Sequence, residues 1–339
     1  MVTIKDIAEK ADVSAATVSL ALNDSDKIRP ETIRKIKRIA RELNYTPNMR
    51  GRALVKGINN TIGLVVPEIE NPFYAEVVKA VKNVMYEQDF HVLLASTDYN
   101  SEEEKRYINL FKNGMIDGAI FVGVADLKAT NDQIILELAR DYIPVVNIFR
   151  ENVQINELPQ INARIKEALY SSTEYLIELG HTKIAYVGES EERLAGYKKA
   201  LREHDLPIRS EYIFKNYHII EQGAEVGHKL IKLADFPTGL VCYNDEIAMG
   251  VIQVLANQGI KIPENLSVVG CDNIKLASFT NPPLTTVDIP KREIAEQAAH
   301  ILLEMIDRGA ESFRGQNIKY DTELIERNSA IPYRECSVL

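Results

Sequence analysis

The stretch that decides the first part of the fold is TIKDIAEKADVSAATVSLALN, residues 3–23. Thr3 is expected to cap a first helix, with the Asp6 carboxylate reaching back to it, and apolar residues recur at helical spacing as far as Ala11. Ser14 is a favourable N-cap for a second helix that ends near Leu22. Two short helices joined by a turn of about four residues predict a helix-turn-helix.

A third helix is predicted to begin at Pro30, since proline suits the first turn, and to end near Asn44. Its expected apolar stripe consists of Ile33, Ile36, Ala40 and Leu43. Its expected outward cations are Lys35, Arg38 and Arg41. The three helices predict a small all-α domain, and a helical interaction module without a DNA role is the alternative.

Charge is unevenly distributed along the chain. The 339 residues have a net charge of −9, yet residues 1–60 carry twelve Lys and Arg against seven Asp and Glu, a net +5. The rest of the chain therefore holds −14. A small basic head on an acidic body indicates a nucleic-acid-binding unit joined to a second module, although a solvated helix face explains part of the excess.

Composition excludes several classes of protein. With 45% hydrophobic and 26% charged residues, the chain is typical of a globular protein and not of a disordered one. Cys242, Cys271 and Cys336 are far apart, which argues against a disulfide framework or a zinc module and favours the cytoplasm. No apolar run approaches the roughly 18 residues of a membrane span, and the polar start does not resemble a signal peptide.

Apolar residues in the body recur with a different spacing from those in the head. Residues 62–66, IGLVV, form an apolar run of strand length, and a helical stretch follows from about Phe73 to Gln88. Further buried strands are expected at residues 91–96, 118–122, 144–148, 184–187, 239–243 and 266–270. Because helix-length segments separate these strands, the pattern predicts an α/β body of two doubly wound parallel-sheet lobes.

Catalytic signals are missing from this pattern. The chain has no G-x-S-x-G, no P-loop, no H-E-x-x-H and no G-x-G-x-x-G after a strand, and its six His are scattered. We therefore expect neither an enzyme nor a bound cofactor. The rival hypothesis is a small-molecule-binding protein, or an enzyme, whose basic head serves assembly.

The order of residues in the head resembles the DNA-binding domain of the LacI/GalR family of bacterial transcription regulators. The matching runs are TIKDIAEKADVSAATVSLALND, IRPETIRKIKRIARELNYTPN and RGRAL. The resemblance implies that the second helix lies in the major groove of DNA. It implies phosphate or base-edge contacts from Ser14, Thr17, Ser19 and Asn23, with Ala15, Ala16 and Leu20 facing the bases. It also implies contacts to the backbone or grooves from Ile4, Lys5, Tyr45 and Asn48.

Residues 50–55 match the hinge helix of this family. The match implies phosphate contacts from Arg50 and Arg52 and a minor-groove wedge at Leu54. Gly51 stands where Ala is usual, which costs about 1 kcal/mol of hinge helicity per subunit. Leu20 stands where Arg is usual, so it cannot bind guanine bidentately and can meet a thymine methyl instead. The operator sequence is therefore expected to differ from the common one.

The body resembles the same family over residues 61–330. Matching pieces include IGLVVPEIENPFYAEV, YLIELGHTKIAYVG, NDEIAMGVI and NPPLTTVDIP. The resemblance implies a fold similar to periplasmic sugar-binding proteins, with a ligand between two lobes. Implied cleft residues are Asn71, Phe73 and Tyr74 from the first lobe and Arg193, Asn244, Asp245 and Asp272 from the second, with Phe73 or Phe279 stacking on the ligand. A lobe-closing hydrogen bond or ion pair is the alternative role for the polar members of this set.

One departure bears on the ligand. Family members carry an Asp-Asn pair about 17 residues before the Gly-His that corresponds to Gly180-His181, whereas this chain has Ala163-Arg164 there. A carboxylate is lost and a cation is gained, so an anionic effector such as a phosphorylated sugar, contacted by Arg164, is a reasonable hypothesis. A degenerate pocket, with a protein co-regulator or no effector, is the alternative.

The expected architecture follows from these patterns. We expect a DNA-binding domain at 1–48, a hinge at 49–60, a body at 61–330 and a tail at 331–339. Lobe one is expected at about 61–160 and 291–320, and lobe two at about 161–288. The tail lacks a leucine heptad repeat, so a tail-mediated tetramer is disfavoured. The family resemblance implies a cytoplasmic homodimeric repressor that binds a pseudo-palindromic operator.

Overall fold

The structure, a computed structural model, describes residues 2–22, 25–43, 45, 59–123, 131–150 and 157–334. The chain divides into two compact units, Met1–Asn59 and Asn60–Leu339, which are called here the head and the body. The predicted hinge falls almost wholly on residues outside the described ranges, as do residues 335–339 of the predicted tail.

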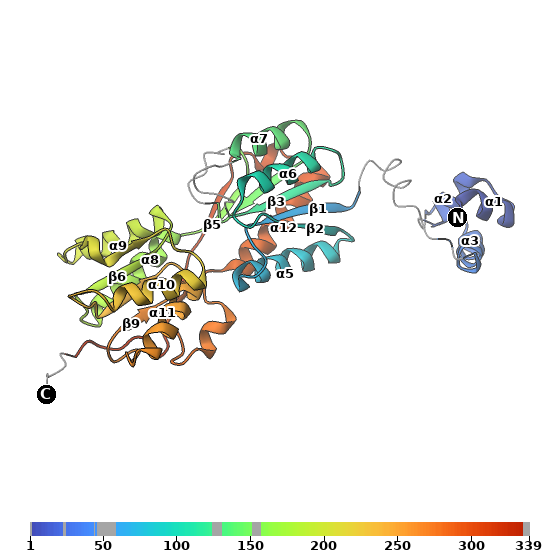
Figure 1. Cartoon of the computed structure of the whole chain (residues 1–339). Helices are drawn as coiled ribbons and strands as arrows, with labels where there is room; N and C mark the ends of the chain where they lie inside the picture. The colour runs from blue at the N-terminus through green and yellow to red at the C-terminus, as the bar shows by residue number, and fades with distance from the viewer. Residues whose placement is uncertain are drawn as a thin grey trace. The chain divides into compact units, whose positions relative to one another are not determined.

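The head contains α1 (Ile4–Ala11), α2 (Ala15–Leu22) and α3 (Pro30–Glu42) (Figure 1). At the start of α1, the Asp6 carboxylate accepts hydrogen bonds from the backbone N–H and the hydroxyl of Thr3, at 2.7 and 2.8 Å. At the start of α2, the Ser14 hydroxyl oxygen accepts the Thr17 N–H at 3.1 Å. Both predicted helix starts are confirmed.

The head is held together by one small apolar core. The three helices bury side chains of modest size: Ile7, Ala8, Ala11, Val18, Ala21, Ile36, Ile39 and Ala40. Asp12 ends α1 in the left-handed conformation, with φ 55°, and the exposed Lys35 donates to the Ala11 carbonyl at 2.8 Å. A cation at the carbonyl end of a helix is favourable, so α3 stabilises the end of α1.

The first lobe of the body is built on a parallel sheet of order β11-β5-β4-β3-β1-β2. Its strands are β1 (Thr61–Val66), β2 (His91–Ser96), β3 (Gly118–Val122), β4 (Val145–Ile148), β5 (Gln160–Ala163) and β11 (Asn317–Tyr320). One face packs on α5 (Pro72–Glu87) and α12 (Lys291–Arg308), and the other on α6 (Ser101–Phe111) and α7 (Asp132–Asp141). Apolar runs such as Ile62–Val66 are buried on both faces, as this layering requires.

The second lobe has a parallel sheet of order β7-β6-β8-β9. Its strands are β6 (Ile184–Gly188), β7 (Ile213–Lys215), β8 (Gly239–Cys242) and β9 (Ser267–Val269). Its helices are α8 (Ile165–Glu178), α9 (Glu191–Glu203), α10 (Ile220–Leu230) and α11 (Asp245–Asn257), followed by the short 3-10 helix η2 (Lys275–Phe279). Thus the predicted class, a small helical head plus an α/β body with parallel sheets, is confirmed.

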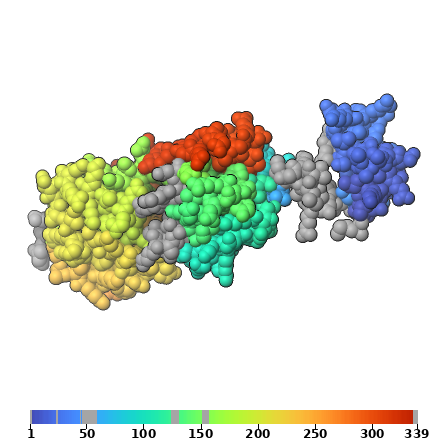
Figure 2. Space-filling view, turned by 90° about the horizontal axis from the view of Figure 1, so that it is seen from above, coloured from blue at the N-terminus to red at the C-terminus, as the bar shows by residue number. Residues whose placement is uncertain are grey.

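The chain passes between the lobes three times. It leaves β5 for α8 at Arg164, returns to α12 after β10 (Thr286–Asp288), and crosses again between β11 and β12 (Glu323–Ile325). In Figure 2 the red C-terminal segments lie over the green first lobe, although they are distant from it in sequence. Strands β10 and β12 pair antiparallel beside these crossings.

The lobe limits differ slightly from those expected from the sequence. The first sheet includes Gln160–Ala163, so the second lobe begins near Arg164 and not at 161. Residues after β12 pack on the second lobe, where the Tyr333 N–H donates to the Leu179 carbonyl at 2.7 Å. Part of the predicted tail is therefore a structural element of that lobe.

Candidate DNA-binding face and effector cleft

Helix α2 offers a polar and small-residue face to the surroundings. It buries only Val18 and Ala21. Ser14, Ala15 and Ala16 are exposed, Thr17 and Ser19 are half-buried, and the Leu20 side chain is 39% exposed. Small exposed residues let a helix approach a DNA groove closely.

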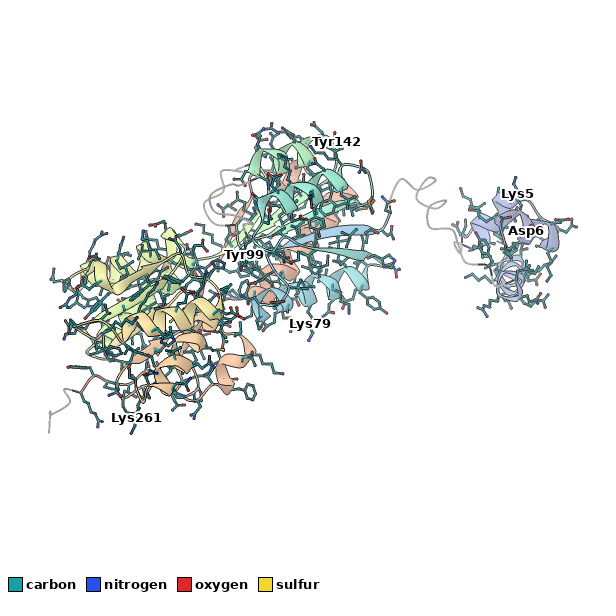
Figure 3. The ribbon with its side chains drawn as sticks, in the orientation of Figure 1. Lys5, Asp6, Lys79, Tyr99, Tyr142 and Lys261 are labelled. Atoms are coloured by element: carbon teal, nitrogen blue, oxygen red, sulfur yellow. The ribbon has the colours of Figure 1, made fainter. Side chains whose placement is uncertain are left out.

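The remaining predicted DNA contacts divide into described and undescribed residues. Lys5 projects from α1 into solvent (Figure 3), Ile4 is half-buried, and Tyr45 is half-buried with its N–H donating to the Ala40 carbonyl at 2.9 Å. Residues outside the described ranges are Asn23, Asn48, Arg50, Arg52 and Leu54. The predicted face is thus presented by α2 and the start of α1.

In the body, the predicted first-lobe cleft residues begin α5, directly after β1. The Asn71 side chain caps this helix by accepting the Phe73 N–H at 2.8 Å. The Phe73 ring packs edge-on against Tyr74 and Phe149, with ring centroids 5.3 and 5.0 Å away. Asn71 and Phe73 are both buried, whereas Tyr74 is half-buried.

Tyr74 belongs to a chain of hydroxyl groups that sequence reasoning did not find. A hydrogen bond joins the Tyr74 and Tyr99 hydroxyls, and Tyr99 donates to the Glu68 carboxylate at 2.9 Å. Burial and nearby acidic groups raise the pKa of both phenols. The Tyr99 ring contacts the His218 ring of the second lobe, with centroids 4.7 Å apart, and Tyr99 lies where the lobes meet (Figure 3).

The opposite wall contains Arg193, stacked on an aromatic ring. Its guanidinium lies over the Tyr243 ring, 4.1 Å from the centroid, and also donates to the Tyr243 carbonyl. Arg193 lies 3.8 Å from the Asp272 carboxylate. Asp272 has φ 109°, and its carbonyl accepts a hydrogen bond from the buried Lys291 ammonium at 2.8 Å. Both alternatives given for Arg193 and Asp272 fit this geometry, because the pair borders the cleft while contacting its own lobe.

Two other predicted cleft residues have folding roles. Asn244 caps α11 by accepting the Ile247 N–H at 2.8 Å and donates to the His218 carbonyl at 2.9 Å. The Asp245 side chain, wholly buried, accepts the Ile274 N–H at 2.8 Å and the Thr286 hydroxyl at 2.5 Å. Desolvation, and next the charge of Asp272, raise the pKa of Asp245 to about 8. Asp245 therefore ties α11 to the segments after β9 and at β10.

Arg164 and Phe279 are not brought to this cluster. Arg164 is the N-cap residue of α8 and pairs with the exposed Asp321 at 2.8 Å, across two of the lobe-crossing segments. Phe279 ends η2 and is 74% exposed.

Acidic side chains of both lobes gather where the lobes meet. Glu68 of the first lobe faces Glu246 and Asp272 of the second, and burial with these neighbours raises the pKa of Glu246 to about 7. The basic groups beside them are Lys291, bound to the Asp272 carbonyl, Arg193, engaged as described, and His218, whose Nδ1 lies 2.8 Å from a Glu189 oxygen. An acidic, tyrosine-lined cleft suits hydroxyl-rich ligands, because carboxylates accept hydrogen bonds from hydroxyls and rings pack on apolar faces.

The residues that sequence reasoning missed follow a general rule for parallel sheets. Glu68, Tyr99 and Tyr243 each come within three residues after the end of a strand. Ligands in open α/β folds bind outside the carboxyl ends of strands, and that rule applied to β1, β2 and β8 would have selected these three. His218 follows β7 in the same way.

The described residues contain neither a candidate metal site nor a candidate membrane span. No group of three or more His, Cys, Asp or Glu side chains among them is placed to hold a metal ion. Within the same ranges, no helix is both long and apolar enough to span a bilayer.

Comparison with known proteins agrees with both modules. Residues 3–48 match the model for bacterial regulatory proteins of the lacI family, and residues 173–330 match the periplasmic binding protein-like domain. The transcriptional repressor CytR of Escherichia coli K12 is 32% identical over 338 residues, covering 96% of each chain. Catabolite control protein A of Priestia megaterium is 31% identical over 314 residues, covering 91% of this chain and 93% of the relative.

Among solved structures, the lac repressor dimer bound to operator and the anti-inducer ONPF has a TM-score of 0.84 at 22% identity, covering 97% of this chain and 99% of that one, and shows the shared fold. The regulator CelR in complex with cellobiose has a TM-score of 0.72 at 25% identity, covering 97% and 100%. CytR is a transcriptional repressor, and the head matches a family of bacterial regulatory proteins, so the comparisons support a transcription regulator and not the rival hypothesis of a catalytic body. The chain belongs to the LacI family of bacterial regulatory proteins.

Proposed function

We propose that this regulator represses transcription as a homodimer in the cytoplasm, with α2 of each subunit in the major groove of a pseudo-palindromic operator. The observation that carries the proposal is the exposed face of α2, from Ser14 to Leu20, on a basic head. One head binds DNA weakly and mainly through phosphates, so two heads are needed for a specific site. The hinge at residues 49–60 remains part of this proposal.

Exposed apolar side chains support the homodimer. The first lobe exposes Leu94 on the edge strand β2, and Leu110 and Met115 are also exposed. The second lobe exposes Leu276 and Phe279 on η2. Apolar groups in such number on a soluble surface favour a partner, and a second copy of this chain joins two heads for one operator. Sedimentation should give a dimer, and Leu276→Lys with Phe279→Lys should shift it towards monomer.

For the effector, we propose a small molecule between the lobes that controls operator binding. Support comes from the tyrosine-lined cleft, from CelR in complex with cellobiose, and from an Enterococcus faecium regulator with bound ribose, 25% identical over 81% of this chain. These favour a carbohydrate effector and carbohydrate-related genes. The carboxylates of Glu68, Glu246 and Asp272 disfavour an anion in this cleft, and Arg164 is engaged with Asp321. A protein co-regulator or no effector is the alternative.

The DNA-binding proposal is tested by selecting duplexes from a random pool with the purified full chain. We expect enrichment of one sequence with two inverted half-sites, because two copies of α2 read the same bases. A pool that stays random, or one that enriches a single asymmetric half-site, contradicts the proposal.

The effector proposal is tested by thermal melting with free sugars, phosphorylated sugars and nucleobases. A cleft ligand stabilises the folded chain by RT ln(1 + [L]/Kd). We expect neutral sugars to raise the melting temperature and Tyr99→Phe to weaken that effect. If no compound raises the melting temperature, the result favours a protein co-regulator or regulation without an effector.

A further inference from the structure

Tyr99 has an unusual backbone conformation at a position where the two lobes meet. It lies in the turn after β2, and the φ angles of Asp98 and Tyr99 are 49° and 56°. The Ser96 hydroxyl donates to the Asp98 carboxylate at 2.7 Å, and the Tyr99 N–H bonds to the Pro67 carbonyl at 3.3 Å. A bulky side chain seldom accompanies a positive φ, and residues held in this way cluster at functional sites.

The Tyr99 side chain reaches from the first lobe to the second. Its ring contacts the His218 ring, with centroids 4.7 Å apart and planes inclined by 52°. Its hydroxyl stays with the first lobe, where it donates to the Glu68 carboxylate at 2.9 Å and is hydrogen-bonded to Tyr74. Tyr99 is half-buried at the junction of the lobes (Figure 3). One lobe thus holds the hydroxyl, and the other lobe contacts the ring.

His218 is fixed in its turn by the second lobe. Its N–H donates to the Gln222 side-chain oxygen at 2.8 Å, and its carbonyl accepts the Asn244 side-chain N–H at 2.9 Å. Its ring Nδ1 lies 2.8 Å from a Glu189 oxygen. The two rings are therefore supported separately, each by its own lobe, so the lobes cannot move apart without breaking the contact between them.

Charges near this contact favour the opposite movement. Burial, and next the charge of Glu68, raise the pKa of Glu246 to about 7. Glu68 follows β1 of the first lobe and Glu246 lies on α11 of the second, so the two carboxylates repel each other across the junction. Separation of the lobes relieves this repulsion, whereas it costs the contact between Tyr99 and His218.

We propose that Tyr99 is a latch, whose ring rests on His218 and holds the two lobes together without a ligand. The arrangement in which the rings touch is called closed here. An aromatic contact of this kind changes an equilibrium by about two- to tenfold, so the latch favours the closed arrangement without locking it. A ligand or an operator can still shift the lobes through its own preference for one arrangement.

The latch has a consequence for control of the operator. Lobes that are already closed present a formed cleft, so a ligand that prefers the closed arrangement binds more tightly. Loss of the latch should also change operator affinity in the absence of any effector. This regulatory part rests on the proposed function, whereas the latch itself does not. The lobe arrangement is therefore measured without DNA and without a ligand.

The experiment is single-molecule energy transfer in the full chain, between dyes on Tyr142→Cys and Lys261→Cys. These exposed positions lie on the first and the second lobe, respectively (Figure 3). Cys242 and Cys271 are buried, and Cys336→Ser removes the third native thiol. Labelled chain is mixed with an excess of unlabelled chain, so that a dimer carries one labelled copy. Each molecule is then scored as closed or open.

Tyr99→Gly should raise the ratio of open to closed molecules by about two- to tenfold. Glycine accepts a φ of 56° without strain, so this variant should fold, which circular dichroism checks. His218→Ala should raise the ratio similarly, and the double variant should raise it no further than the larger single effect. Tyr99→Phe keeps the ring and should stay near the wild-type ratio. Tyr86→Gly, which removes an exposed ring from α5, is the matched control and should have no effect.

Four outcomes overturn the proposal. They are an unchanged ratio in Tyr99→Gly, an equal rise in Tyr86→Gly, a rise in Tyr99→Phe as large as in Tyr99→Gly, and a double variant whose rise is the product of the two single effects. The third would mean that bonds within the first lobe matter and the ring contact does not. If the lobes open as expected while operator affinity is unchanged in Tyr99→Gly, the latch stands and its regulatory consequence is wrong.

Discussion

The exposed face of α2 and the cleft of the body use polar residues in opposite ways. On α2, Ser14, Ala15 and Ala16 are exposed and the helix depends on Val18 and Ala21 for its packing. In the cleft, Asn71, Asn244 and Asp245 are buried and cap helices or join segments. In the head, the positions matched to the family motif are therefore exposed, whereas in the body such positions as often have a folding role.

This difference follows from how the two sites are made. A recognition helix presents consecutive residues of one element, so spacing alone fixes which side chains face outward. A cleft is assembled from the ends of several strands, and residues there must first satisfy the backbone groups of those ends. Four substitutions separate folding roles from binding roles, and they are given below in order of expected effect.

Asp245→Ala should be the most damaging change, and it acts on the body. It leaves the Ile274 N–H and the Thr286 hydroxyl buried without their acceptor, which costs about 3 kcal/mol of unfolding free energy. Urea denaturation followed by circular dichroism measures this loss. Asp245→Asn keeps one acceptor and should cost clearly less, and equal stability of the Ala variant and wild type would contradict the folding role.

Ala16→Asp should impair operator binding and leave stability unchanged, the reverse of Asp245→Ala. The side chain is exposed, so stability should be unchanged, while a carboxylate against DNA phosphates in both subunits should reduce operator affinity by about 100-fold. Fluorescence anisotropy with the selected operator measures the change. Gln133→Asp adds the same charge on α7 of the body and should bind normally, and a similar loss in both variants would show a general charge effect.

Leu20→Arg should change which operator is preferred. An exposed Leu suits a thymine methyl, whereas Arg binds guanine bidentately, a difference worth about 1–3 kcal/mol at one base pair of each half-site. Competition between the selected operator and versions changed at single positions checks this expectation. Identical preferences for the two proteins would mean that Leu20 does not face the bases.

Glu246→Gln should have the smallest effect, and its effect should depend on pH. The folded-state pKa of Glu246 is about 7, above its unfolded value, so the wild type loses stability as pH rises through this interval. After allowance for its partial exposure, the variant should gain about 1 kcal/mol at pH 8 and nothing at pH 4. Denaturation at both pH values tests this, with the exposed Glu87→Gln as control, and an equal gain at both would contradict the acidic-cleft description.

Much of the architecture could be predicted from hydrophobic period and turn chemistry. Long apolar runs such as Ile62–Val66 give a strand wherever a sheet is covered on both faces. Short strands such as β5, β7 and β11 carry no comparable signal, because they form only when neighbouring strands offer an edge. The lobe limits were therefore the least predictable part of the fold.

The cleft was harder to predict for a further reason. Tyr99 of the first lobe lies near enough to Tyr243 of the second for Tyr243 to help raise the pKa of Tyr99, and no local sequence pattern records that proximity. The pairing of Arg164 with Asp321 joins residues on different lobe-crossing segments, so an unpaired cation was the natural inference from sequence. Which ligand a site prefers depends on how its charges are paired with residues distant in sequence, and those pairings can be known only from the fold.

The most direct test of the central claim, that α2 reads an operator, is the ratio of affinities for the selected operator and a shuffled duplex of equal length. It should be measured by anisotropy from about 50 to 200 mM salt, because phosphate contacts make binding salt-dependent. The account predicts a ratio of about 1,000 or more, with affinity falling steeply as salt rises. Equal affinity for the two duplexes at every salt concentration would contradict it.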